Sequence, residues 1–189
     1  MKVQNIRRTP TKKLIEEAFT ELLRKKDFEK VTIKDITELA KINRATFYAH
    51  FEDKYQLFDE MIKDSATEML KINTKEAKLW NKKQVECLFR GVFEYLQQVK
   101  VSCPYSYQNL FPLLRKKMLD ALKTHLESLF NLSEFKEIKE FHIFIYSRII
   151  YEAAELLVVE KTNLSQIKIV EEVSVLIFNK QSSFLNECT

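Results

Sequence analysis

The sequence predicts an all-α protein, and two observations support this fold class. One glycine and three prolines in 189 residues leave almost no residues suited to the tight turns of β-hairpins. Apolar residues instead recur three and four positions apart along much of the chain, as they do in amphipathic helices. We expect a three-helix unit with a helix-turn-helix arrangement at residues 1–55, followed by a larger helical bundle at residues 56–189.

Composition limits the class of protein further. The chain is 46% hydrophobic and 31% charged, long enough for one large domain or for a small domain joined to a medium one. It contains no run of about 18 apolar residues, and residues 1–13 lack the apolar core of a signal peptide. The sequence therefore predicts neither a membrane span nor export, and we expect a cytoplasmic protein. Cys87, Cys103 and Cys188 are odd in number and lack a C-x-x-C spacing, so we expect reduced structural thiols.

The positive charge of the chain is concentrated in its first third. Residues 1–55 contain 13 Lys and Arg against 9 Asp and Glu, whereas residues 56–189 contain 18 of each. A localised basic excess suits a phosphate-binding surface, although charged residues also serve simply to solvate a surface.

The first two helices are predicted by an apolar stripe and a capping pattern. Residues 11–26 should form the first helix, with the following apolar residues on its inward face: Leu14, Ile15, Ala18, Phe19, Leu22 and Leu23. The second helix should open at Thr32, because Asp35 stands three positions on and completes an approximate capping box.

Two more helices follow closely. Asn43 is the expected N-cap of a third helix at residues 44–50. Asp53, with Gln56 at the capping-box position, should open a fourth helix that runs to about residue 72. Two short helices joined by a tight turn and packed on a longer one are the helix-turn-helix arrangement.

The third predicted helix has small residues on its outward face. On a helical wheel at about 100° per residue, Phe47 and Phe51 lie on one side and should face the core. Ala45 and Ala49 lie opposite, flanked by Thr46 and Tyr48. Small side chains let a helix backbone come close to another surface, so this face suits the major groove of DNA.

Polar and charged residues around this helix extend the predicted DNA-binding surface. Arg44 can reach base edges or a phosphate, and Thr46 offers a methyl and a hydroxyl group. His50 and Lys54 follow, and Lys54 with the free amides at the start of the fourth helix would form a phosphate clamp. Alanine is also a good helix former and Tyr48 could pack at a solvent edge, so the wheel alone leaves a structural explanation open.

Residues 31–58, VTIKDITELAKINRATFYAHFEDKYQLF, resemble the signature of the TetR family of bacterial transcriptional regulators. The resemblance covers roughly residues 9–58 and rests on T-x-x-D-I, F-Y-x-H-F and D-K at this spacing. It implies an N-terminal three-helix DNA-binding domain followed by a divergent helical domain for effector binding and dimerisation. By motif position, it implies DNA contacts from Lys34, Asn43, Arg44, Thr46, Tyr48, His50 and Lys54, with close approach at Ala45 and Ala49.

The turn between the second and third helices departs from the family pattern. Many members have a glycine there, whereas this chain has Lys41 and Ile42. Lys41 must therefore adopt a positive φ, or the turn must differ slightly.

Four further helices are predicted in the rest of the chain. One begins at about residue 81, and Pro112 suits the first turn of the next. The last two are expected at residues 134–160 and 165–183, the latter with Ser165 as its N-cap.

The last two predicted helices are apolar enough to need burial on two sides. One face of each should pack within the domain and another against a second copy, which gives a four-helix seam in a homodimer. The TetR resemblance favours this arrangement, although a wholly intramolecular core in a monomer is the alternative. The predicted interface contains Ile149, Ala153, Leu156, Val173 and Leu176.

A ligand pocket is less clearly marked. Aromatic residues suited to a small amphipathic or aromatic effector are spread over several helices: Phe89, Phe93, Tyr105, Tyr107, Phe111, Tyr146 and Tyr151. Such residues are more often ordinary core. His125 and His142 have no ligand at a recognisable metal spacing, and no catalytic or nucleotide-binding motif is present, so we expect no metal, no cofactor and no enzymatic activity.

These features predict a homodimeric regulator that binds an operator in duplex DNA and acts as a repressor released by a small effector. In the alternative, the second domain binds a partner protein, and the chain is a coactivator or scaffold. A cavity of a few hundred Å³ in the second domain would favour the first hypothesis. A third, an all-helical enzyme or lipid carrier, would make the basic excess of residues 1–55 incidental.

Overall fold

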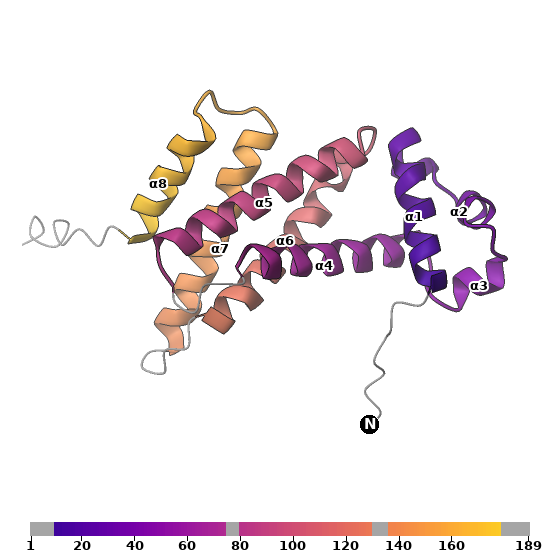
Figure 1. The fold of residues 1–189 in the computed structure, drawn as a ribbon, viewed down its shortest axis with the longest axis horizontal. Helices are drawn as coiled ribbons and strands as arrows, with labels where there is room; N and C mark the ends of the chain where they lie inside the picture. The colour runs from indigo at the N-terminus through magenta and orange to yellow at the C-terminus, as the bar shows by residue number, and fades with distance from the viewer. Residues whose placement is uncertain (1–9, 75–79, 130–135, 179–189) are drawn as a thin grey trace, which may run out of the picture. The chain divides into compact units, whose positions relative to one another are not determined.

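The computed structural model describes residues 10–74, 80–129 and 136–178, and these residues are predominantly helical (Figure 1). The N-terminal elements are α1 (Pro10–Lys25), the short 3-10 helix η1 (Phe28–Lys30), α2 (Ile33–Leu39) and α3 (Arg44–Tyr48). They are followed by α4 (Lys54–Asn73), α5 (Lys82–Ser102), α6 (Tyr107–Leu129), α7 (Lys136–Val158) and α8 (Gln166–Phe178). No strand is present in these three ranges, and the prediction of an all-α fold is confirmed.

The chain divides into two compact units. The first contains residues 1–65 and 97–117, and the second contains residues 66–96 and 118–189. Three helices, α4, α5 and α6, therefore contribute residues to both units. The domain boundary predicted after residue 55 falls within the first unit, and it stays a prediction.

The core of the first unit is built from aromatic rings. Phe19, Phe28 and Phe58 contact one another with ring centroids 5.4–6.4 Å apart. Phe47 and Phe51 are also buried. The inward stripe predicted for the first helix is only partly correct, because Leu14 is 48% exposed. Leu14 lies about 100° around the helix from Ile15, so both cannot face a narrow core contact.

Side chains cap the helices of the first unit at the predicted positions. The Thr32 hydroxyl accepts a hydrogen bond from the Asp35 amide at 3.1 Å, and the Asp35 carboxylate accepts one from the Thr32 amide at 2.8 Å. The Asn43 side chain accepts from the Thr46 amide at 2.7 Å, and Asp53 accepts from the amide three residues on at 2.7 Å. These contacts confirm the predicted starts of α2, α3 and α4.

A left-handed lysine ends α2. Lys41 has a φ of 54°, as expected for a turn without glycine. The Ile42 amide donates to the Thr37 carbonyl at 3.0 Å, and the Lys41 amide donates to the Glu38 carbonyl at 3.3 Å. This hydrogen-bond pair is the Schellman arrangement, which sets the direction in which the chain enters α3.

The later helices agree with the sequence in number but differ at some ends. Pro112 is the sixth residue of α6 rather than part of its first turn, so that prediction was wrong. The Ser165 hydroxyl accepts from the Lys168 amide at 3.3 Å and caps α8 as predicted. Residues 179–183, which were expected to extend α8, lie outside the described residues.

Two cysteines are described, and both are free thiols. Cys87 is half-buried, and Cys103 is buried in the first unit. Burial raises the pKa of the Cys103 thiol to about 11, so it stays protonated at neutral pH. Cys188 lies outside the described residues.

Candidate nucleic-acid interface

Helix α3 presents the predicted outward face. Phe47 is 0% exposed and Phe51 is 1% exposed, whereas Tyr48 is 55% exposed. Ala45 and Ala49 are also exposed. The wheel therefore assigned the inner and outer faces correctly. The DNA contacts themselves stay predictions.

The helix predicted at residues 44–50 is shorter in the structure. Helix α3 ends at Tyr48 rather than residue 50, and the His50 and Phe51 amides both donate to the Phe47 carbonyl at 2.9 Å. The helix ends in a tight turn here, and this turn places both Phe47 and Phe51 in the core. His50 is left half-buried.

Asn43 and Thr46 are joined to each other at the start of α3. The Asn43 side-chain oxygen accepts from the Thr46 amide and, at 2.9 Å, from the Thr46 hydroxyl. The Thr46 oxygen can still accept a hydrogen bond, and its methyl group remains available for an apolar contact. Asn43 and Arg44 are both exposed.

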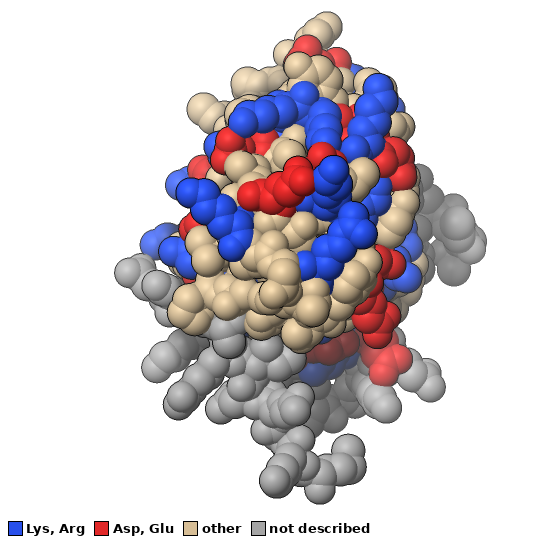
Figure 2. All heavy atoms as spheres, turned by 90° about the vertical axis from the view of Figure 1, so that its right-hand side faces the viewer, with Lys and Arg blue, Asp and Glu red and all other residues tan. Residues whose placement is uncertain are grey.

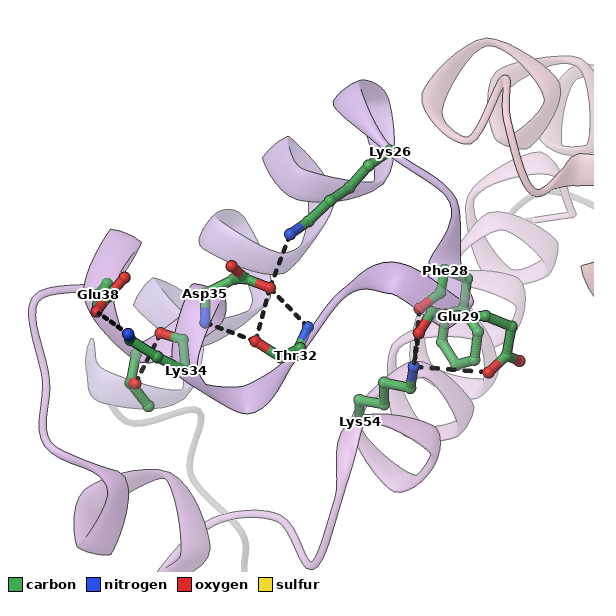
Figure 3. Close-up of polar contacts among 9 residues, drawn as sticks. Lys26, Phe28, Glu29, Thr32, Lys34, Asp35, Glu38 and Lys54 are labelled. Carbon is green, nitrogen blue, oxygen red and sulfur yellow. Dashed lines mark hydrogen bonds and ion pairs between the residues drawn. The ribbon is translucent and has the colours of Figure 1, made fainter.

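The cations on this side of the unit are mixed with acidic residues. Figure 2, which faces α2 and α3, shows Lys and Arg side chains with Asp and Glu among them and uncharged residues alongside. Lys34 is 66% exposed and pairs with Glu38 at 3.7 Å (Figure 3). Such an exposed pair contributes little to stability, so the lysine can exchange its partner for a phosphate. Lys2, Arg7 and Arg8, which supply much of the basic excess, lie outside the described residues.

Lys54 occupies a different position from the one expected for a phosphate clamp. Its ammonium group donates to the carbonyl oxygens of Phe28 and Glu29, both at 2.9 Å (Figure 3). Its side chain is only 13% exposed, and the ammonium lies 4.7 Å from the centroid of the Phe28 ring. The ammonium would have to leave both carbonyls to bind a phosphate, so the structure assigns Lys54 an internal contact instead.

Lys12 is a buried cation that the sequence did not single out. Its ammonium donates to Glu60 at 2.8 Å, lies 3.9 Å from Asp64 and is 5.5 Å from the centroid of the Phe51 ring. The ion pair with Glu60 joins α1 to α4, next to the buried ring of Phe51 that follows α3. No periodic pattern links residue 12 to residue 60, so only the folded chain reveals this pair.

Asp35 combines a helix cap with an ion pair. Its carboxylate accepts from the Lys26 ammonium at 2.7 Å and from both the amide and the hydroxyl of Thr32 (Figure 3). The hydrogen bond from Lys26, followed by those from Thr32, lowers the pKa of Asp35 to about 2. The start of α2 is therefore fixed by a carboxylate that stays ionised at all physiological pH values.

The predicted ligand-pocket residues do not belong to one unit. Tyr105, Tyr107 and Phe111 lie in the first unit, and the other four lie in the second. Phe89 and Tyr151 are 0% exposed, and Tyr105 is 63% exposed. A surface hollow of about 440 Å³ in the second unit is lined by other residues: Lys82, Glu86, Arg90, Gln166, Ile167, Val170 and Glu171. The ligand contacts therefore stay predictions.

The predicted dimer residues differ in exposure. Leu156 and Leu176 are 43% and 68% exposed, and Ile149 and Ala153 are half-buried. Val173 is 3% exposed, so it packs inside its own unit and has almost no surface left for a second copy. Its assignment to the interface is not supported.

The described residues contain neither a metal cluster nor a membrane-spanning helix. Among them, no three His, Cys, Asp or Glu side chains are grouped so that they could hold a metal ion. Within the same ranges, no helix is long and apolar enough to cross a membrane.

The segment that contains α2 and α3 is similar to a known protein family. Residues 14–61 match the sequence model of a family described as bacterial regulatory proteins, tetR family. In this segment the chain is similar to the tetR family. The match contains η1, α2 and α3 completely, together with most of α1 and the first two turns of α4.

Two curated relatives resemble the same part of the chain. The uncharacterized HTH-type transcriptional regulator YxbF of Bacillus subtilis (strain 168) is 39% identical over 61 residues, which are 32% of this chain and 16% of YxbF. The HTH-type dhaKLM operon transcriptional activator DhaS of Lactococcus lactis subsp. lactis (strain IL1403) is 30% identical over 64 residues, 34% of each protein. The chain thus spans 16% of the length of YxbF and 34% of the length of DhaS.

Solved structures extend the likeness to the whole fold. The dihydroxyacetone kinase operon activator DhaS aligns over 90% of this chain and 95% of its own, with a TM-score of 0.51 and 19% identity. SCO7518 from Streptomyces coelicolor A3(2) aligns over 90% of this chain and 99% of its own, with a TM-score of 0.58 and 13% identity. At these identities the likeness shows a shared helical fold.

Proposed function

We propose that the chain is a DNA-binding transcriptional regulator that acts in the cytoplasm as a homodimer. One observation carries the proposal: Ala45 on α3 and Ala49 at its C-cap are exposed, while Phe47 and Phe51 are buried beneath them. This arrangement lies within residues 14–61, which match the tetR family model. The proposed activity needs neither a catalytic group nor a cofactor.

The exposed face of α3 suits the major groove. The two alanines let the backbone approach the base edges, and Tyr48 and Thr46 contact the groove from either side. Arg44 stands at the helix start, where it can reach a guanine edge or a phosphate. Lys34, whose exposed pair with Glu38 opens readily, supplies a further phosphate contact.

Apolar side chains on the last two helices support the homodimer. Helices α7 and α8 pack on each other, yet Phe141 is 61% exposed, Ile167 is 74% exposed and Leu176 is 68% exposed. A second copy would remove this apolar surface from water, which is the main favourable term in association. Two recognition helices could then contact half-sites one helical turn of DNA apart, or a multiple of it.

The direction of regulation has two candidates. Our primary proposal is a repressor that a small effector, bound in the predicted second domain (residues 56–189), releases from its operator by changing the separation of the recognition helices. DhaS, which the chain resembles in its N-terminal segment and in fold, is called an operon activator, and this favours a second candidate. In that candidate, the second unit binds a partner protein and the chain is a coactivator.

A binding-site selection tests the proposal. Wild-type protein should enrich an inverted repeat from a pool of random duplexes, with half-site centres about 10 base pairs apart or a multiple of that spacing. Fusing the selected sequence to a reporter promoter then separates repression from activation by the sign of the change. Failure to enrich any sequence, with a folded protein, would refute the proposed function.

A further inference from the structure

Lys54 joins the two ends of the helix-turn-helix. The carbonyls that it binds belong to Phe28 and Glu29 in η1, which precedes α2, and Lys54 itself opens α4, which follows α3. The ammonium group of Lys54 therefore binds two carbonyls that precede it by 26 and 25 residues in the sequence. This contact joins the two ends of the segment that contains both α2 and α3 (Figure 3).

The environment of this ammonium group makes the connection firm. Besides the two carbonyls, the Glu29 carboxylate lies 3.7 Å away, and the rings of Phe28 and Tyr55 lie at 4.7 Å and 5.3 Å. The Tyr55 hydroxyl donates to Glu29 at 2.9 Å, which holds the carboxylate in place. A largely buried cation is costly without partners, and charged donors form the stronger class of hydrogen bond.

Ser106 holds the same 3-10 helix from another part of the chain. The Phe28 amide donates to the Ser106 hydroxyl at 2.5 Å in a buried hydrogen bond, and Ser106 is 1% exposed. Ser106 lies in the connection between α5 and α6, directly before the first residue of α6. The Phe28 carbonyl thus accepts a hydrogen bond from Lys54, and the Phe28 amide donates one to Ser106.

We propose that Lys54 and Ser106 are positioning residues for DNA binding, which hold η1 between the start of α4 and the α5–α6 connection. This inference rests on the proposed function. If the α5–α6 connection moves, the hydrogen bond from Phe28 to Ser106 moves η1 with it. Because Lys54 binds η1, the start of α4, which follows residues 44–50, then moves as well. Lys54 acts through this contact and not by binding a phosphate.

The test uses two variants and a matched control. Lys54→Met keeps an unbranched apolar stem without the charge, and Ser106→Ala removes only the hydroxyl. Ser128→Ala is the control, because Ser128 is exposed and its hydroxyl donates to the His125 carbonyl within its own helix. The probe is a duplex that wild-type protein selects from a random pool. Affinity is titrated at several salt concentrations, and amide exchange is followed at residues 28–31.

Both positioning variants should bind the duplex about tenfold more weakly, the loss expected when a buried or charged hydrogen bond is removed. Their slopes of log affinity against log salt should equal the wild-type slope, and amide exchange at residues 28–31 should rise. Ser128→Ala should behave as wild type in all three measurements.

Several results would overturn the inference. A shallower slope for Lys54→Met, by about 0.9 for each phosphate lost, would make Lys54 a phosphate contact. If Ser106→Ala binds the duplex as tightly as wild type, the α5–α6 connection does not position η1 for DNA binding. If wild-type protein selects no duplex, the proposed function fails, while amide exchange still decides whether the two residues hold η1. Unchanged exchange in both variants would then refute the inference.

Discussion

Asp35 shows at the residue scale how one carboxylate fixes the start of α2. Hydrogen bonds from Lys26 and Thr32 hold its pKa at about 2, below the ordinary value of 3.8. A lowered pKa contributes stability above pH 4, which is lost as the pH falls toward 2. Asp35→Asn should therefore lower the free energy of unfolding by about 1 kcal/mol at pH 7, and by progressively less between pH 4 and pH 2. Urea denaturation across this range measures it, and a constant difference would contradict the role of the charge.

Single residues also mark what local sequence can and cannot predict. The burial of Phe47 and Phe51, the caps at Thr32 and Asn43 and the positive φ of Lys41 all depend on neighbours within a few positions. The internal contacts of Lys54 and Lys12 depend on partners 25 to 48 residues away. Helical periodicity tells which face of a helix is buried, but it does not tell which distant group meets a charge there.

Helix-to-helix contact can be tested at the single glycine. Gly91 in α5 packs so closely that a Cβ would lie 2.6 Å from the Met69 sulfur and 2.9 Å from the Asn73 side-chain nitrogen, both on α4. Gly91→Val should lower the free energy of unfolding by about 1–3 kcal/mol, because its branched side chain overfills the contact. Gly91→Ala should stay within about 1 kcal/mol of wild type, since helix propensity offsets small shifts of two flexible side-chain ends. Equal, small effects in thermal or urea unfolding would show that the helices separate easily.

The ends of elements were harder to predict than their existence. Pro112 is compatible with a first turn, so the sequence placed the start of α6 too late, whereas the helix begins at Tyr107. A proline costs a helix one backbone hydrogen bond, and burial of neighbours such as Leu110 and Leu114 compensates for that loss. Tertiary packing therefore decided the boundary over local preference.

The homodimer belongs to the scale of the whole molecule. Ala153 on α7 lies between Ile149 and the exposed Leu156, and a charge placed there by two-fold symmetry would enter the interface from both copies. Ala153→Arg should give monomers that lose most of their affinity for the selected duplex, because each half-site supplies only part of the binding free energy. Thr124→Arg, on an exposed part of α6, is the matched control.

Sedimentation beside a DNA titration separates the outcomes of that experiment. A dimeric Ala153→Arg variant would place the interface elsewhere, and a monomer that binds as tightly as wild type would contradict the two-half-site mechanism. The sequence indicated this interface through the apolar character of residues 141–159, but it also included Val173, which the fold buries within its own unit. Apolar patterning shows that a residue needs burial, not whether a second chain supplies it.

The most direct test of the central claim compares wild-type protein with Ala49→Leu in one DNA titration, with circular dichroism on the same samples. Ala49 is exposed and has helical backbone angles at the C-cap of α3, which leucine adopts readily, so the helical signal and the melting temperature should be unchanged. Binding to the selected duplex should be lost, because the larger side chain holds α3 away from the groove. Phe47→Ala, which empties the core and costs about 3–5 kcal/mol, should instead lose binding by unfolding. An Ala49→Leu variant that is folded and binds as tightly as wild type would contradict the assignment of this face to DNA.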